Sequence, residues 1–93
     1  MLFELGQLVA TRGVADKMAE DAVFASFTRQ SLAKHATGNW GELCSEDKEA
    51  NDVAVKEGCI RVFSAYKQEG LPKIWIITEA DRSVTTILFP DEY

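Results

Sequence analysis

Three β-rich runs near the C-terminal end constrain the fold of this chain more than any other feature. They are residues 60–66, 73–78 and 84–89. Gly70 and Pro72 interrupt the first gap, and the polar residues 79–83 fill the second. Because both connections are short, we expect the strands to pair in sequence order as an antiparallel meander. The unbroken apolar run 74–77 predicts a central strand that is covered, at least partly, on both faces.

The preceding part of the chain predicts one strand and two helices. Residues 2–10 alternate loosely and are rich in Leu and Val, which indicates a strand. A short helix follows Thr11, a candidate N-cap, and residues 21–36 then show helical periodicity. The apolar stripe of that second helix consists of Phe24, Phe27, Leu32 and Ala36. Gly38 stands just past its last turn and is expected to end it.

A further helix is predicted over residues 45–57, with Ser45 as its N-cap and Gly58 directly after its end. Two glycines bracket Trp40 in the turn before it, so Trp40 is expected to anchor that turn on the core. The sequence therefore predicts an α+β fold of order β-α-α-α-β-β-β in a single domain over residues 1–93. The helices are expected to pack on one face of a sheet that includes the first strand.

Composition and charge exclude several classes of protein. Hydrophobic residues make up 46% of the chain and charged residues 27%, which is typical of a globular domain rather than a disordered one. The net charge of −5 opposes direct nucleic-acid binding, which needs Lys and Arg, and is compatible with a basic protein partner. No apolar run approaches the ~20 residues of a membrane helix, and the N-terminus lacks signal-peptide features. We therefore expect a cytoplasmic protein.

The cysteines and the histidine do not form a recognisable metal or disulfide pattern. Cys44 and Cys59 are too few for a disulfide scaffold and lack the paired spacing of a zinc site. His35 is the only histidine and does not complete such a site. We expect two reduced, partly buried thiols, and no metal or cofactor.

The first candidate site is the polar turn at residues 78–83. Glu79, Asp81 and Arg82 lie between two strongly apolar strands, and Thr85 follows closely. Carboxylate, guanidinium and hydroxyl groups at one tip are suited to a phosphate, a nucleotide or a charged side chain of a partner. Trp40 is also a member of this candidate binding set, and its competing interpretation is the anchoring role given above. The competing interpretation is a solvated turn in which Asp81 caps its own backbone.

The second candidate is an acidic helical segment. Residues 42–57 contain six acids and two lysines, which gives a net charge of −4. The acids are Glu42, Glu46, Asp47, Glu49, Asp52 and Glu57. Such a segment is suited to docking a basic protein. The competing interpretation is an ordinary solvated helix face with acids favoured near its N-terminal end.

Several stretches resemble a known family. They are residues 35–43, which contain Gly-Asn-Trp-Gly-Glu-Leu, residues 64–66, and residues 73–90, which contain WIITEADRSVTT. Over most of its length the chain resembles a family of short bacterial proteins labelled hypothetical or plasmid-related, and sometimes type I restriction subunit. The resemblance implies a bacterial or mobile-element accessory protein without an established activity. The chain has no methyltransferase or nuclease motif that would support the restriction label.

Three hypotheses for function follow. The first is a small acidic interaction or accessory protein, not an enzyme, that exists as a monomer or a homodimer. The second is a small RNase-like enzyme that uses the C-terminal sheet, with Arg61, Thr78, Arg82 and Thr85 on the strands and His35 nearby; the negative charge argues against it. The third is a nucleotide or small-molecule binder at the turn 79–83.

Overall fold

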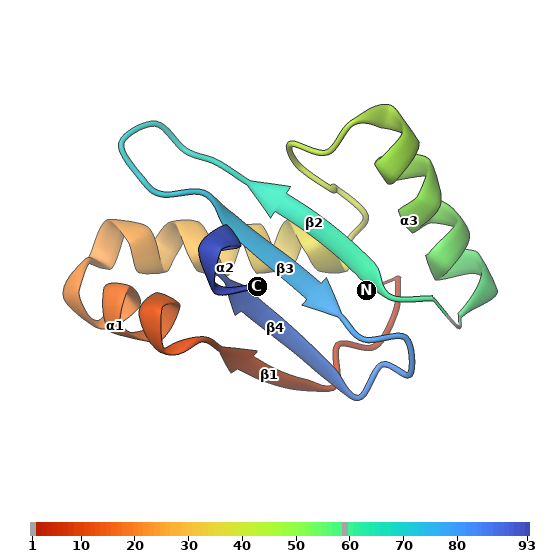
Figure 1. Ribbon diagram of the computed structural model, residues 1–93, viewed down its shortest axis with the longest axis horizontal. Coiled ribbons are helices and arrows are strands. Elements are labelled where there is room, and N and C mark those ends of the chain that lie inside the picture. The colour runs from red at the N-terminus through yellow and green to blue at the C-terminus, as the bar shows by residue number, and fades with distance from the viewer. Residues whose placement is uncertain (1, 59) are drawn as a thin grey trace.

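The computed structural model describes residues 2–58 and 60–93, and it contains one strand, then three helices, then three more strands (Figure 1). The elements are β1 (Gln7–Ala10), α1 (Arg12–Glu20), α2 (Ala22–Ala36), α3 (Ser45–Glu57), β2 (Val62–Tyr66), β3 (Ile74–Thr78), β4 (Val84–Leu88) and a 3₁₀ turn (Pro90–Glu92). This order confirms the predicted α+β arrangement. None of the helices in the described part of the chain has the length and apolar character needed to cross a membrane.

The four strands form one mixed sheet in the order β1-β4-β3-β2. β2 pairs with β3 and β3 with β4 in antiparallel fashion, so the predicted meander is confirmed. β1 lies parallel to β4, with Gln7 opposite Val84 and Ala10 opposite Ile87. The first and last strands of the chain are therefore neighbours, and β3 is a central strand.

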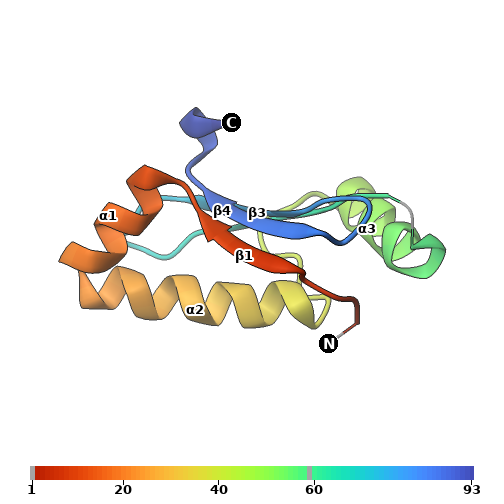
Figure 2. The same cartoon turned by 90° about the horizontal axis from the view of Figure 1, so that it is seen from below.

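The helices pack against one face of this sheet. Figure 2 shows α2 lying across that face, with α1 at one end of it and α3 at the opposite side of the molecule. Phe24 from α2 packs in the main core with Ile74, Ile76 and Ile87. A second cluster joins Ala54 of α3 to Val62 and Trp40. Burying one such Phe or Ile side chain contributes about 1.5–3 kcal/mol, which is why these few contacts hold the layers together.

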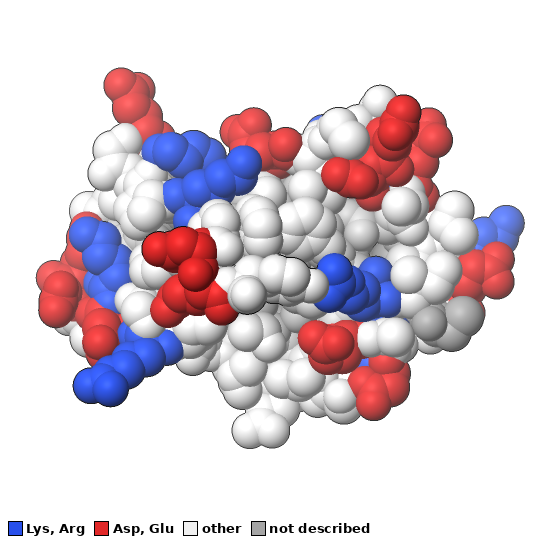
Figure 3. Space-filling view, in the orientation of Figure 1, with Lys and Arg blue, Asp and Glu red and all other residues white. Residues whose placement is uncertain are grey.

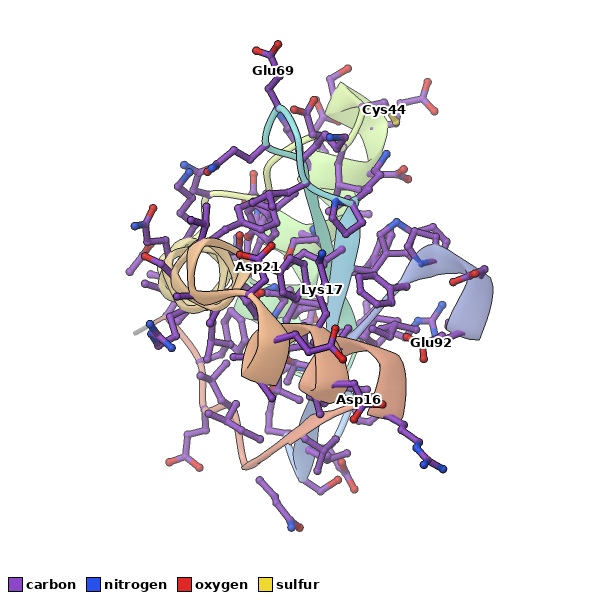
Figure 4. All side chains as sticks on the ribbon, turned by 90° about the vertical axis from the view of Figure 1, so that its left-hand side faces the viewer. Asp16, Lys17, Asp21, Cys44, Glu69 and Glu92 are labelled. Carbon is purple, nitrogen blue, oxygen red and sulfur yellow. The ribbon has the colours of Figure 1, made fainter. Side chains whose placement is uncertain are left out.

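The boundaries of α2 follow from the chemistry of its ends. The Asp21 carboxylate accepts hydrogen bonds from Val23 N at 3.0 Å and Phe24 N at 3.1 Å. The hydrogen bond from Phe24 N is the main reason that the pKa of Asp21 lies below its ordinary value, and Lys17 at 3.5 Å adds to the effect (Figure 4). The predicted helix over residues 21–36 is thus confirmed to within one residue, with Asp21 as its cap.

Two predicted caps differ in the structure. Cys44, not Ser45, occupies the N-cap position of α3 with extended backbone, and Ser45 is the first helical residue. Thr11 does occupy the N-cap position of α1, but its hydroxyl donates to Glu92 Oε1 at 2.6 Å instead of capping the helix. Cys44 is exposed at the start of α3, so the expectation of a partly buried thiol is wrong there (Figure 4). The same expectation for Cys59 lies outside the described residues.

The first strand is shorter than the predicted 2–10. Gly6 adopts a φ of 65°, and a Cβ at this position would lie 2.4 Å from the carbonyl oxygen of Arg82. The chain therefore turns at Gly6, because only glycine fits so close to the neighbouring turn. Before this turn, Phe3 packs against the His35 ring at a centroid distance of 5.4 Å. The alternation seen in residues 2–6 thus comes from packing beside the sheet rather than from strand pairing.

The central strand β3 is covered unequally on its two faces. Ile74, Ile76 and Thr78 face the helices and are fully buried. Trp75 is half-buried and packs edge-on against Phe63 at 5.1 Å. The predicted partial cover on both faces is therefore confirmed, with the helix side carrying most of it.

Candidate functional site

A chain of buried hydrogen bonds links α2 to three strands through His35. His35 Nδ1 lies 2.5 Å from Ser64 Oγ, and Nε2 lies 2.9 Å from Thr78 Oγ1. Thr78 Oγ1 lies 2.7 Å from Thr85 Oγ1, which donates to the carbonyl oxygen of Leu5 at 2.7 Å. The imidazole and all three hydroxyl-bearing side chains have no exposed surface. We call these four residues the His35 chain.

The end of the His35 chain determines the direction of its hydrogen bonds as far as the imidazole. A carbonyl oxygen only accepts, so Thr85 donates to Leu5 and must accept from Thr78. Thr78 then accepts from Nε2–H of His35. Burial lowers the pKa of His35 from 6.5 to about 4, so the ring is neutral at pH 7. With its one proton on Nε2, the ring accepts from Ser64 at Nδ1.

The His35 chain is arranged like a nucleophile and base, yet it is closed to substrates. Ser64 next to an imidazole nitrogen is the pair that nucleophilic catalysis uses. The Phe3 and Trp40 rings, however, pack against the imidazole in T-shaped arrangements, with ring centroids 5.4 Å and 5.9 Å away. Both ring nitrogens already have hydrogen-bond partners, and Ser64 has no exposed surface that a substrate could reach. The arrangement joins the two layers of the fold rather than presenting a reactive group.

The predicted turn site is organised around Arg82, which points toward α3. Its guanidinium donates to the carbonyl oxygens of Ala54 at 3.0 Å and Ile60 at 2.7 Å. It also lies 5.5 Å from the centre of the Phe3 ring, a cation–π distance. Arg82 adopts a φ of 61°, which is uncommon for a residue other than glycine. The guanidinium thus caps the end of α3 and fastens the β3–β4 turn to it.

The acidic residues of the same turn behave differently from Arg82. Asp81 Oδ1 accepts from Ser83 N at 3.0 Å, and the hydrogen bonds from the Ser83 side chain and backbone hold the pKa of Asp81 below its ordinary value. Glu79 is exposed. Asp81 therefore caps its own turn, as the competing interpretation of the sequence had it.

The five residues of the predicted binding set do not lie together. Glu79 and Asp81 are exposed at the turn, and Arg82 is turned toward α3. Thr85 is buried within the His35 chain, and Trp40 is 4% exposed beneath α3. The Trp40 indole donates to Asp52 Oδ1 at 3.0 Å, which fits its predicted role as an anchor.

Replacing Arg82 tests its role as a clamp. We expect Arg82→Ala to lower the free energy of unfolding by about 2–3 kcal/mol, because the carbonyl oxygens of Ala54 in the last turn of α3 and of Ile60 after it lose a charged donor. Arg82→Lys should recover only part of this loss, since one ammonium does not reach both carbonyls in the same geometry. Urea unfolding measures the effect. The control is Arg61→Ala, whose exposed guanidinium bonds the Tyr93 hydroxyl at 2.7 Å; an equal loss in both variants would contradict the clamp.

α3 has little cover in the structure, although it is firmly attached. Only Asn51 and Ala54 are buried in it. Asn51 bonds the backbone of Phe63 twice: its amide donates to the carbonyl oxygen, and its Oδ1 accepts from Phe63 N at 3.1 Å. Trp40 and Arg82 supply the further attachments described above. The helix therefore has a defined position while most of its surface faces solvent.

The outer face of α3 carries acids around one apolar side chain. Counting 100° per residue from the buried Asn51, the residues furthest from the core are Glu46, Glu49, Val53 and Glu57, together with Lys56. Val53 is 50% exposed. Figure 3 shows Asp and Glu side chains gathered over the region of α3. We call Glu46, Glu49, Val53, Lys56 and Glu57 the outer α3 face.

No family model, curated protein or solved structure matches the chain, so comparison with known proteins assigns no function to any of these residues. Among residues 2–58 and 60–93, no group of three or more His, Cys, Asp or Glu side chains is arranged to hold a metal ion. We take the outer α3 face as the candidate functional site, because it joins firm attachment to an exposed, charged surface.

Proposed function

We propose that this protein is a small acidic interaction protein, an accessory factor of bacterial or mobile-element origin, which docks a basic protein on the outer α3 face. The observation that carries the proposal is the combination of firm attachment and poor cover at α3. Side-chain bonds from Asn51, Trp40 and Arg82 hold the helix, yet its outer face packs against nothing in the described chain. A helix that contributes little to the core and is held so specifically is suited to presenting its surface to another molecule.

The composition of the outer α3 face indicates the chemistry of the partner. The half-exposed Val53 has Glu49 and Glu57 one turn away on either side and Lys56 beside it, and with Glu46 the face has a net charge of −2. A complementary surface would carry Lys or Arg around an apolar contact. The surrounding segment holds most of the net charge of the chain. Such a field speeds association with a basic protein and repels nucleic acid.

The two alternative functions have less support from the geometry. An RNase-like mechanism would need His35, Thr78 and Thr85 at the surface, and all three are fully buried. Arg61 and Arg82 bond the Tyr93 hydroxyl and the end of α3, so they do not converge on one substrate position. A nucleotide site at the turn 79–83 would need a free guanidinium, whereas that of Arg82 is committed to carbonyl oxygens.

Charge reversal on α3 tests the proposal. Tagged protein is purified from its native host, and co-purifying proteins are identified by mass spectrometry. We expect a basic protein to co-purify with the native sequence and to be lost with Glu46→Lys/Glu49→Lys, because the local charge changes sign. Binding of the purified pair should weaken by about tenfold or more between 0.05 and 0.5 M salt, since exposed charges are screened.

A matched control separates local from overall charge. Asp16→Lys/Glu20→Lys makes the same change of charge at exposed positions of α1 and should retain the partner. Circular dichroism on all variants checks that α3 remains folded. Retention of the same proteins by the α3 variant, or enrichment of nucleic acid alone, would refute docking on the outer α3 face.

A further inference from the structure

The two edge strands of the sheet differ in how far their outward-facing backbone groups are hydrogen-bonded by the rest of the chain. The outer edge of β2 is occupied: Asn51 bonds Phe63 through both its backbone groups, and Ala65 bonds Trp40 O at 3.4 Å and Glu42 N at 2.7 Å. These contacts imitate an additional strand and leave little for another chain to pair with. The opposite edge, β1, has no such cover, and Figure 1 shows no helix or strand beyond it.

The hydrogen-bond pattern identifies the free groups of β1. Gln7 N donates to Ser83 O at 3.0 Å, and Thr11 N donates to Ile87 O at 3.0 Å. Backbone groups alternate in direction along a strand, so residues 7, 9 and 11 face β4 while Leu8 and Ala10 point away from it. No hydrogen bond to the backbone of Leu8 or Ala10 from outside β1 is found among the described residues. β1 also carries no charge or proline, which proteins commonly use to protect an exposed edge.

An apolar groove runs along this open edge on the helix side. Leu8 and Ala10 share a face with their register partners Thr85 and Ile87, which point toward α2. The groove is lined mainly by apolar side chains, with Arg29 as its one charged residue: Leu8, Val9, Ala10, Met18, Thr28, Arg29, Leu32 and Ile87. Leu8 is 51% exposed there, which is high for a leucine on the core side of a sheet. A strand added to this edge would place its own side chains into the groove.

We propose that two copies of this chain associate through antiparallel pairing of their β1 strands, which joins the two sheets into one. The two-fold axis passes by Val9. Leu8 of each copy then lies opposite Ala10 of the other, and the two exchange both backbone bonds, about four in total. This register uses all the outward-facing groups of β1. It also places Leu8 of one copy over Ala10 of the other, inside the groove.

The charges beside β1 favour a second copy over an unrelated strand. Glu4 precedes β1 and Arg12 follows it, and both are exposed. Antiparallel pairing about Val9 brings the start of α1 in each copy, which carries Arg12, toward the segment before β1 in the other, which carries Glu4. The Arg12 side chain is 95% exposed and has only a 3.9 Å contact with Asp16 in its own chain. The strand is thus complementary to itself in hydrogen bonding, shape and charge, as a two-fold interface requires.

Sedimentation velocity over about 1 µM to 1 mM tests this dimer. An interface of one short strand and a groove is at the small end of specific interfaces, so we expect a dissociation constant of about 10–100 µM. Leu8→Lys should weaken it at least tenfold, because an apolar contact would be replaced by a second positive charge in the groove that Arg29 lines. Val53→Lys is the matched control, with the same change of charge at a side chain of nearly equal exposure (50% against 51%), and should leave the dimer intact. A monomer at 1 mM, or equal behaviour of both variants, would overturn the proposal.

A charge exchange tests the register independently of any effect on folding. Arg12→Glu and Glu4→Arg should each weaken self-association, since each places like charges together. An equimolar mixture of these two variants should form a heterodimer at least as tight as the native dimer, because every cross-pair is then opposite in sign. Native mass spectrometry distinguishes hetero- from homodimers by mass. A statistical mixture without preference for the heterodimer would rule out the Val9-centred register.

Discussion

His35→Ala is expected to lower the free energy of unfolding by about 3–5 kcal/mol at pH 7. The substitution leaves a cavity where a fully buried ring stood, and it removes a hydrogen-bond partner from both Ser64 and Thr78. Those hydroxyl groups are sealed from water, so they lose a partner that solvent does not replace. Urea unfolding measures the loss. Lys34→Ala, at the exposed neighbouring position of α2, is the control and should cost less than about 0.5 kcal/mol.

The cost of His35→Ala should also depend on pH. The pKa of His35 is about 4 in the folded protein and 6.5 when the chain is unfolded, so the unfolded state binds the proton more tightly. The stability linked to this group is fully present above pH 6.5 and is lost as pH falls toward 4, by about 3 kcal/mol in total. His35 is the only histidine, so the variant should lack this dependence between pH 6.5 and 4.5.

The pH window separates His35 from the carboxylates. Asp21, Asp81 and Glu92 have pKa values below their ordinary 3.8, 3.8 and 4.5, because hydrogen-bond donors stabilise their charged forms. Their contributions are present above those ordinary values and are lost only in more acidic solution. Parallel stability curves for the native and His35→Ala proteins between pH 6.5 and 4.5 would contradict a neutral, buried His35.

Gly41→Ala is expected to cost about 3–5 kcal/mol, far more than a positive φ alone. Gly41 has a φ of 73°, and a Cβ at this position would lie 2.0 Å from the carbonyl oxygen of Ala65. Relief of that clash would move the turn away from β2 and break the bond between Glu42 N and Ala65 O. Thermal or urea unfolding gives the magnitude, and exposure of the β2 edge should add a tendency to aggregate.

Gly58→Ala is the matched control for Gly41→Ala. Gly58 has nearly the same backbone, with a φ of 78°, but no described atom lies within 4 Å of the position its Cβ would take. The expected cost is therefore only that of the left-handed backbone, about 1–2 kcal/mol. The difference between the two variants measures the close approach to Ala65. Equal losses would show that the approach is not limiting.

Local sequence signals predicted the elements well because their physical causes are local. The Asp21 carboxylate accepts hydrogen bonds from the first N–H groups of α2. Gly38, just past the other end of α2, adopts a φ of 87° that is incompatible with a continued helix. The three C-terminal strands follow from β-branched runs and short turns. The extent of β1 depends instead on contacts far away in the sequence: Gly6 bends because of the turn at Arg82, and Phe3 packs beside His35. No local pattern within residues 2–10 contains that information.

The RNase-like hypothesis placed His35 near Thr78 and Thr85, but it did not predict that these residues are buried or that Ser64 joins them. A signal for the His35 chain is nevertheless present in the alternation. Ser64 shares a face with Val62 and Tyr66, and Thr78 shares one with Ile76. Polar residues flanked at two-residue spacing by apolar ones are expected on the core side, where they need partners, and the only histidine lies on the facing helix.

The turn at residues 79–83 illustrates the opposite difficulty. Its composition indicates a binding site and a structural turn equally well, because charged groups serve both purposes. The direction of the Arg82 side chain distinguishes them, and that direction depends on where the carbonyl groups of Ala54 and Ile60 lie in space. The function itself stays a proposal that rests on the outer α3 face.

The position of β4 has a consequence for how the protein is made. β4 is synthesised after the other three strands, yet it lies between β1 and β3 in the sheet. Until β4 is made, β1 has no strand to pair with, and β3 has one unpaired edge. Because the pairing of Gln7 with Val84 joins residues that are far apart in the sequence, the sheet can form only after β4 has been made. We expect a chain truncated before β4 to keep these strand edges unpaired rather than to form a smaller folded protein, and therefore to be degraded readily by proteases.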